Sequence, residues 1–116
     1  MSFARKKPVR DADGRAIIGR TFTVRVADVT VHVTVNTNVQ GRAVEVFGKA
    51  DCGWQGWLDT LMETVSLALQ FGTPMGTILH HWRYQRFEPM GIVGQGVSIP
   101  DAIAKRLFDE GYGKEV

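Results

Sequence analysis

The stretch GWQGWLDTLMETVSLALQF, residues 53–71, contains the longest apolar run with a clear helical period. Its polar residues, among them Gln55 and Ser66, fall mostly on one face of a helix, and Gly72 can take the left-handed conformation that ends it. Such a wide apolar face needs a sheet to pack against. The predicted apolar face consists of Trp54, Trp57, Leu58, Leu61, Met62, Val65, Ala68 and Leu69.

Strand patterns come directly before this helix. Valines alternate with Thr and His over residues 29–35, which predicts a strand with one buried and one polar face. Residues 22–26 and 43–47 show the same period, and residues 15–19 predict a short edge strand. Ala27-Asp28 and the Asn-rich segment 36–41 are predicted to be turns. Because these strands are close in sequence, an antiparallel meander is expected.

Two shorter helices are expected after the long one. Thr73 is the predicted cap of a helix over about residues 74–82. Ser98 is the predicted cap of a third helix, with Asp101 at the capping-box position, and Gly111 ends it. The predicted fold class is therefore α+β, with an antiparallel sheet of three to four strands packed on one long helix and two shorter helices.

Length and composition indicate one small globular domain. The chain has 116 residues, of which 44% are hydrophobic. A single cysteine, Cys52, excludes an internal disulfide and fits a reducing compartment. No apolar run is long enough to cross a membrane, and no apolar signal segment follows the N-terminal charges. We expect a cytoplasmic protein without a membrane partner.

Positive charge is concentrated at the N-terminus. Residues 1–25 contain seven Lys or Arg and two Asp, whereas the other 91 residues carry a net charge of −3. We expect residues 1–14 to form a disordered basic arm and residues 15–116 to form the single domain. The arm is either a solvated leader or a segment that holds nucleic acid or another polyanion.

Three motifs resemble a known family. VSLALQFGTPM at residues 65–75 and RFEPMG at residues 86–91 are similar to the segment after the catalytic barrel of adenosylcobalamin-dependent ribonucleotide reductases. VSIPDAIA at residues 97–104 resembles the T-S-C-P-D motif of the TSCPD domain, with Val97 in place of Thr and Ile99 in place of Cys. This resemblance implies the fold of that domain and a link to nucleotide metabolism.

The same resemblance does not imply ribonucleotide reduction by this chain alone. Ribonucleotide reduction consumes a dithiol, which one cysteine cannot form. These 116 residues contain neither the radical-generating barrel nor the cysteine-rich tail of those enzymes. We expect a short free-standing version of the domain, which suggests a phage, a mobile element or a small accessory protein.

The densest polar and aromatic cluster is the candidate ligand site. It comprises Arg83, Tyr84, Arg86 and Glu88, and Asp101 is predicted to be a further ligand-binding residue. Two arginines and a tyrosine can hold a phosphate and a base. In the alternative interpretation these charges are structural, and Arg86 pairs with Glu88 or with Asp101 to lock the loop onto the third helix.

The start of the long helix offers a second candidate site. Gly53 can supply free N–H groups for an anion, and Trp54 can supply a ring for stacking, although core packing or an oligomer contact explains the tryptophan better. His32, His80 and His81 with Cys52 are enough in number for a zinc site. His80 and His81 are adjacent, however, and adjacent residues of a helix point about 100° apart, which argues against both binding one ion. We predict no catalytic residue, metal or cofactor.

The sequence favours a non-catalytic TSCPD-type domain that binds a nucleotide-like ligand or a protein partner and self-associates as a homo-oligomer. A phage nucleotide-sequestering protein fits this description. One alternative is an accessory subunit of a split adenosylcobalamin-dependent ribonucleotide reductase, which leaves open whether the chain takes part in catalysis. The other is a protein–protein module that acts on host machinery.

Overall fold

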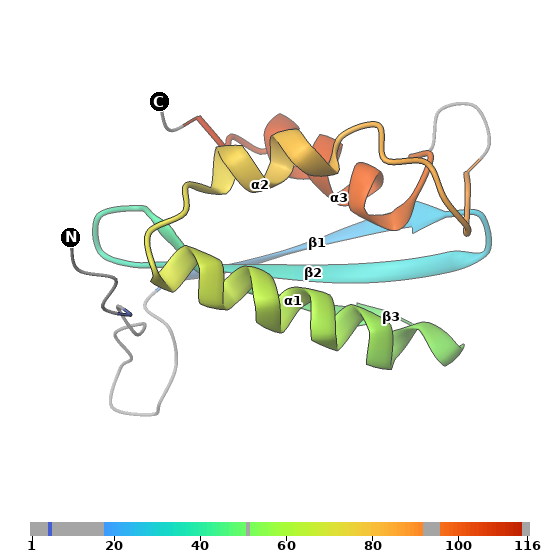
Figure 1. The fold of residues 1–116 in the computed structure, drawn as a ribbon, viewed down its shortest axis with the longest axis horizontal. Helices are drawn as coiled ribbons and strands as arrows, with labels where there is room; N and C mark the ends of the chain where they lie inside the picture. Colours follow the sequence, from blue (N-terminus) through green and yellow to red (C-terminus); the bar gives the residue numbers. More distant parts are fainter. Residues whose placement is uncertain (1–4, 6–17, 51, 92–95, 115–116) are drawn as a thin grey trace.

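The computed structural model describes residues 5, 18–50, 52–91 and 96–114. Within them, a three-stranded sheet of order β1-β2-β3 is followed by three helices (Figure 1). The strands are β1 (Ile18–Val26), β2 (Val29–Thr37) and β3 (Ala43–Ala50), and the helices are α1 (Gln55–Gln70), α2 (Met75–Trp82) and α3 (Ile99–Asp109). The predicted α+β class is confirmed. Residues 1–4, 6–14 and the start of the predicted edge strand lie outside the description.

The sheet is an antiparallel meander. Val26 pairs with Val29 across the tight turn at Ala27-Asp28, and the pairing continues to Ile18 opposite Thr37. Ile18 and Gly19 therefore open β1 and do not belong to a separate edge strand. β2 pairs with β3 from Val31 opposite Ala50 onward. Ala27 takes a left-handed φ of 52°, which a two-residue hairpin turn requires of at least one central residue.

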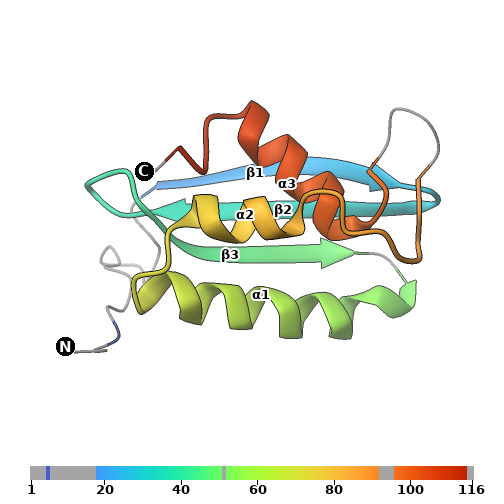
Figure 2. The ribbon, with the colours of Figure 1, turned by 45° about the horizontal axis from the view of Figure 1, so that its top comes forward.

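The two faces of the sheet differ in polarity, as the valine alternation predicts. The inner face carries the valines of β2 and meets apolar residues of all three helices in one core. The opposite face carries cross-strand polar pairs, such as Thr23 Oγ1 with His32 Nδ1 at 2.9 Å. Figure 2 shows α2 and α3 in front of the sheet and α1 running along β3.

α1 differs from the predicted helix in three respects. It begins at Gln55, after a 3₁₀ turn at Cys52–Trp54, and not at Gly53. Trp57, predicted on the buried face, is 39% exposed. Ser66, predicted on the polar face, is buried. The rotation of α1 about its axis explains the last two differences, because α1 turns one polar stripe toward the edge of β3.

That polar stripe forms hydrogen bonds with the open edge of β3. Ser66 Oγ accepts from Val46 N at 2.9 Å and donates to Val46 O at 3.1 Å. Gln55 bonds Ala50 N and Gly48 O, and Gln70 donates to Val44 O. An open strand edge carries unpaired N–H and C=O groups that can pair with another chain. α1 satisfies several of these groups with its own side chains.

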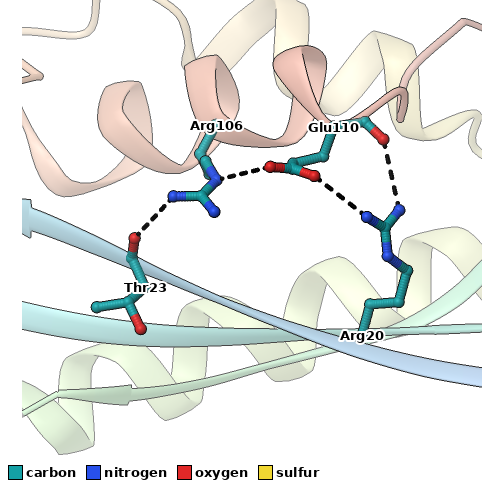
Figure 3. Close-up of polar contacts among 4 residues, drawn as sticks. All are labelled: Arg20, Thr23, Arg106 and Glu110. Carbon is teal, nitrogen blue, oxygen red and sulfur yellow. Dashed lines mark hydrogen bonds and ion pairs between the residues drawn. The ribbon is translucent and has the colours of Figure 1, made fainter.

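α3 packs on β1. A network of hydrogen bonds and ion pairs at the C-terminal end of α3 links the two elements (Figure 3). Glu110 accepts from both Arg20 and Arg106, each at 3.1 Å. Arg106 also donates to the carbonyl of Thr23 at 3.2 Å. Both guanidinium groups lie over the ring of Phe22, at 4.8 Å for Arg20 and 5.4 Å for Arg106. The network joins residues about 90 positions apart in the chain.

The helix ends agree in part with those predicted from the sequence. Ser98 caps α3 as predicted and accepts from Asp101 N at 3.2 Å. Gly72 and Gly111 both have positive φ, as predicted for residues that follow a helix. Thr73, however, is not the cap of α2. Pro74 holds that position without a side-chain hydrogen bond.

Candidate functional site

Asp101 joins the loop after α2 to the start of α3. Its side chain is fully buried. The carboxylate accepts from Tyr84 N at 2.6 Å, from Val97 N at 2.8 Å and from Lys105 Nζ at 3.0 Å. A buried charge is tolerated only when it is paired and hydrogen-bonded, and all three donors here meet that need. Asp101 therefore fixes the backbone on which Arg83 and Tyr84 are carried.

These donors also set the protonation state of Asp101. Burial alone would raise the pKa of its carboxyl group. The N–H groups of Tyr84 and Val97, together with the Lys105 ammonium, outweigh burial and hold the pKa below its usual value. Asp101 is consequently an anion at neutral pH.

Tyr84 is presented to solvent between two cations. Its φ is 65°, a left-handed value that costs energy for a residue with a side chain. Its side chain is 68% exposed. Lys105 Nζ lies 4.9 Å and the Arg83 guanidinium carbon 5.5 Å from the ring centroid. The bond from Tyr84 N to Asp101 holds this strained residue, so that the ring stands at the surface beside positive charge.

Arg83 is partly buried and under-satisfied. Its guanidinium lies 5.3 Å from the ring centroid of Phe108, and Nη2 is 2.9 Å from His80 Nδ1. Because a guanidinium can only donate, His80 Nδ1 is the acceptor. The buried Nε has no hydrogen-bond partner within the described residues. An unpaired buried donor costs free energy, which makes Arg83 an energetically unusual residue in this structure.

Arg83 lines two open cavities. One, of about 420 Å³, is lined by His80 and His81 among others. The second, of about 360 Å³, is lined by Arg83, Tyr84, Lys105, Phe108 and Asp109, and we call it the Arg83 pocket. It combines two cations, one carboxylate and two aromatic rings. That set of groups can bind a phosphate and stack on a planar ring.

The residues predicted at the start of α1 form a different cluster. Gly53 is exposed, and Trp54 packs partly against the core. The ring of Trp54 contacts that of Trp57, with centroids 6.4 Å apart, and Trp57 contacts Phe87 at 6.3 Å. The segment after α2 therefore approaches two helix starts, that of α3 through Tyr84 and that of α1 through Phe87.

Arg86 and Glu88 are exposed, and the described structure gives neither a hydrogen bond nor an ion pair. The predicted pairing of Arg86 with Glu88 or Asp101 is therefore not seen, because Asp101 is buried and bonded to Lys105. Sequence reasoning missed Lys105, Phe108 and His80 as neighbours of Arg83. Two of them had a usable signal from helical spacing, since Lys105 follows Asp101 by four residues and His80 precedes Arg83 by three.

Among the described residues, no group of three or more His, Cys, Asp or Glu side chains could hold a metal ion. None of the helices in this part of the chain has the length and apolarity needed to cross a lipid bilayer.

This meander with three helices, closed by the Ser98–Asp101 turn, defines a small α+β domain with a buried Ser-x-Pro-Asp motif. The family model of the TSCPD domain matches residues 6–110, and the chain belongs to that family. In this chain the motif is structural: Ser98 caps α3, Ile99 is fully buried in the core, and Asp101 holds the loop.

Curated relatives come from one class of enzyme. The chain is 33% identical to a vitamin B12-dependent ribonucleotide reductase of Streptantibioticus cattleyicolor over 111 aligned residues, which cover 87% of this chain and 18% of that protein. It is equally similar to the corresponding protein of Streptomyces clavuligerus, of which it covers 11%. The chain thus spans less than a fifth of the length of these relatives. No solved structure gave a significant match.

Proposed function

We propose that this domain binds a nucleotide or nucleotide-derived molecule in the Arg83 pocket and carries out no chemistry on it. The observation that carries this proposal is the Arg83 pocket itself, where the Arg83 guanidinium and the Lys105 ammonium lie 5.5 Å and 4.9 Å from the exposed ring of Tyr84. A phosphate oxygen is a strong acceptor and matches the forked geometry of a guanidinium. Because the chain is similar to ribonucleotide reductases, we propose that this phosphate belongs to a nucleotide.

The surrounding groups support the same ligand class. Lys105 adds a second positive charge, and the exposed ring of Tyr84 offers a face on which a base can stack. Asp109 lines the same pocket and can accept a hydrogen bond from a ribose hydroxyl or a base amino group. Asp101 acts indirectly, as a positioning residue for Tyr84. Arg86 and Glu88 are exposed close by in the chain and can contact the outer part of a ligand.

The start of α1 is a less suitable phosphate position. Gly53 is exposed in a short 3₁₀ turn, and Trp54 is engaged with Trp57 and the core. We therefore propose that the phosphate binds at Arg83. We propose that Gly53 and Trp54 instead contact a protein partner. Phage origin, cytoplasmic location and self-association remain predictions from the sequence.

Calorimetry on the full chain tests this function. Nucleoside di- and triphosphates are screened first by thermal shift, because a ligand of the native state raises the melting temperature. The best nucleotide is then titrated beside its unphosphorylated nucleoside. We expect Arg83→Gln and Tyr84→Ala each to weaken binding about tenfold to 100-fold, the scale of a charged hydrogen bond or a stacked base.

Two control variants distinguish specific binding in the Arg83 pocket from nonspecific electrostatic binding. Arg25→Gln removes an exposed arginine outside the Arg83 pocket and should bind like wild type. Neutralising Lys6 and Lys7 in the basic segment should reduce only salt-sensitive polyanion binding. The pocket assignment is wrong if both pocket variants bind like wild type, or if no nucleotide shifts the melting temperature.

A second candidate function rests on the curated relatives. As a domain similar to one part of a vitamin B12-dependent ribonucleotide reductase, the chain can serve as an accessory subunit of such an enzyme. The exposed rings of Trp57 and Phe87 offer an apolar contact for that partner. Co-purification with a reductase chain and stimulation of its turnover would favour this role.

A further inference from the structure

A second cavity, separate from the Arg83 pocket, lies between α1 and the open edge of β3. Its volume is about 410 Å³, and it shares no lining residue with the Arg83 pocket. Val46, Phe47, Met62 and Leu67 supply apolar surface, and Ser66 and Gln70 contribute the polar side chains that bond to β3. We call this cavity the α1–β3 groove.

The groove is acidic. Glu45, Asp59 and Glu63 all line it. Asp59 and Glu63 are one helical turn apart on α1, whose sequence contains no Lys or Arg. Glu45 is only 5% exposed and accepts from Asn36 Nδ2 at 3.2 Å. Three carboxylates around one small cavity repel one another, and a positively charged occupant relieves that repulsion.

One basic residue near the N-terminus, Arg5, is exposed and lies at the lining of this groove. Its Nε donates to Gln70 Oε1 at 2.6 Å, across 65 positions of sequence. Lys6, Lys7 and Arg10 follow in the same segment, and no acidic residue occurs before Asp11. The charge of the segment is thus complementary to that of the groove.

We infer that the α1–β3 groove is a docking site for the basic N-terminal segment of this same chain, residues 5–10. Arg5 anchors the segment through Gln70, and the three carboxylates attract the positive charges that follow. Because the segment is tethered to the domain, its effective concentration at the groove is high even though each ion pair is weak. Docking consequently competes with any polyanion for the same Lys and Arg side chains.

Limited trypsin digestion of the full chain tests this inference, because trypsin cleaves after Arg and Lys. The initial rate of cleavage after Arg5 is measured by mass spectrometry and divided by the rate for a free peptide of residues 1–14. At low salt we expect a ratio clearly below one. At 0.5 M salt, roughly a Debye length of 4 Å, the ratio should rise toward one as the attraction is screened.

Two matched substitutions show whether the groove is responsible. Glu63→Gln and Asp28→Asn each remove one charge from an exposed carboxylate, but only Glu63 lines the groove. We expect cleavage after Arg5 to be about two- to fivefold faster in Glu63→Gln, the scale of one exposed ion pair, and unchanged in Asp28→Asn. Asp59→Asn provides a second groove variant and should act in the same direction.

The inference is overturned if the wild-type segment is cut as fast as the free peptide at low salt. It is equally overturned if both groove variants are cut at the wild-type rate. These outcomes are independent of nucleotide binding at Arg83, so failure here leaves the proposed function untouched.

Discussion

Asp101 organises the candidate site from a position that no ligand reaches. Its carboxylate is fully buried, and two of its three donors are backbone N–H groups from separate stretches of loop. Replacing the carboxylate would release both stretches at once. The strained left-handed conformation of Tyr84 would then lose the contact that holds it.

We predict that Asp101→Asn lowers the free energy of unfolding at pH 7 by about 1.5–3 kcal/mol, the scale of a hydrogen bond to a charged group. The folded-state pKa of Asp101 lies below its usual value. Its stabilisation is therefore complete above the unfolded pKa, about 3.9, and is lost as pH falls through the folded pKa. Urea unfolding at pH 7 and pH 3 should show the difference between wild type and variant shrinking in acid.

One result of the urea unfolding experiment would contradict this prediction. A difference between wild type and Asp101→Asn that is the same at pH 7 and pH 3 would mean that the charge of Asp101 contributes nothing to stability.

At the scale of elements, α1 acts as both a packing helix and an edge cover for β3. Its apolar residues, such as Leu58, contribute to the core, where Leu58 fills the space left by the missing side chain of Gly48. Its polar stripe satisfies groups along the open edge of β3. Edge-to-edge pairing with another chain is blocked there by a helix, one of the ways in which natural sheets protect an open edge.

We predict that Ser66→Ala costs about 1–3 kcal/mol, because it leaves both Val46 N and Val46 O without their buried partner. Thr64→Ala is the matched control, since the exposed Thr64 hydroxyl bonds only the carbonyl of Thr60 within its own helix. Its effect should be within about 0.5 kcal/mol of wild type. Chemical denaturation measures both, and equal effects would contradict the edge-cover role of α1.

At the scale of the whole molecule, the surface carries a group of exposed aromatic and apolar side chains. Trp57, Phe87 and Met90 are each about 40% exposed, and the first two rings touch. Aromatic residues and methionine are enriched in protein interfaces, and a domain of this size buries little surface alone. The predicted homo-oligomer would use this surface, as would a reductase partner.

We predict a dimer or higher oligomer in which Trp57 is an interface residue. Trp57→Ala should weaken self-association by about 2 kcal/mol, or roughly 30-fold in dissociation constant. Phe71→Ala, an exposed aromatic at the other end of α1, should leave association unchanged. Light scattering over a concentration series measures both. A wild-type monomer at micromolar concentration and above would contradict the prediction.

The sequence by itself determined the three strands of the meander, the long helix, the Ser98 cap and the family, but not that Ile18 and Gly19 belong to β1. Each of these depends on residues that are close together in the chain. Valines at every second position of residues 29–35 indicate a strand, apolar residues at steps of three and four indicate α1, and the Ser98–Asp101 motif identifies a helix start and a domain family.

Only the tertiary structure decided which polar residues meet. Ser66 is buried because α1 turns it toward Val46, 20 positions earlier, and Asp101 bonds Tyr84 N, 17 positions earlier. Arg5 reaches Gln70 across 65 positions. Periodicity assigns a residue to a face of its own element, but not to a partner. The partner follows from how helices rotate and lie on the sheet, which depends on packing over the whole core.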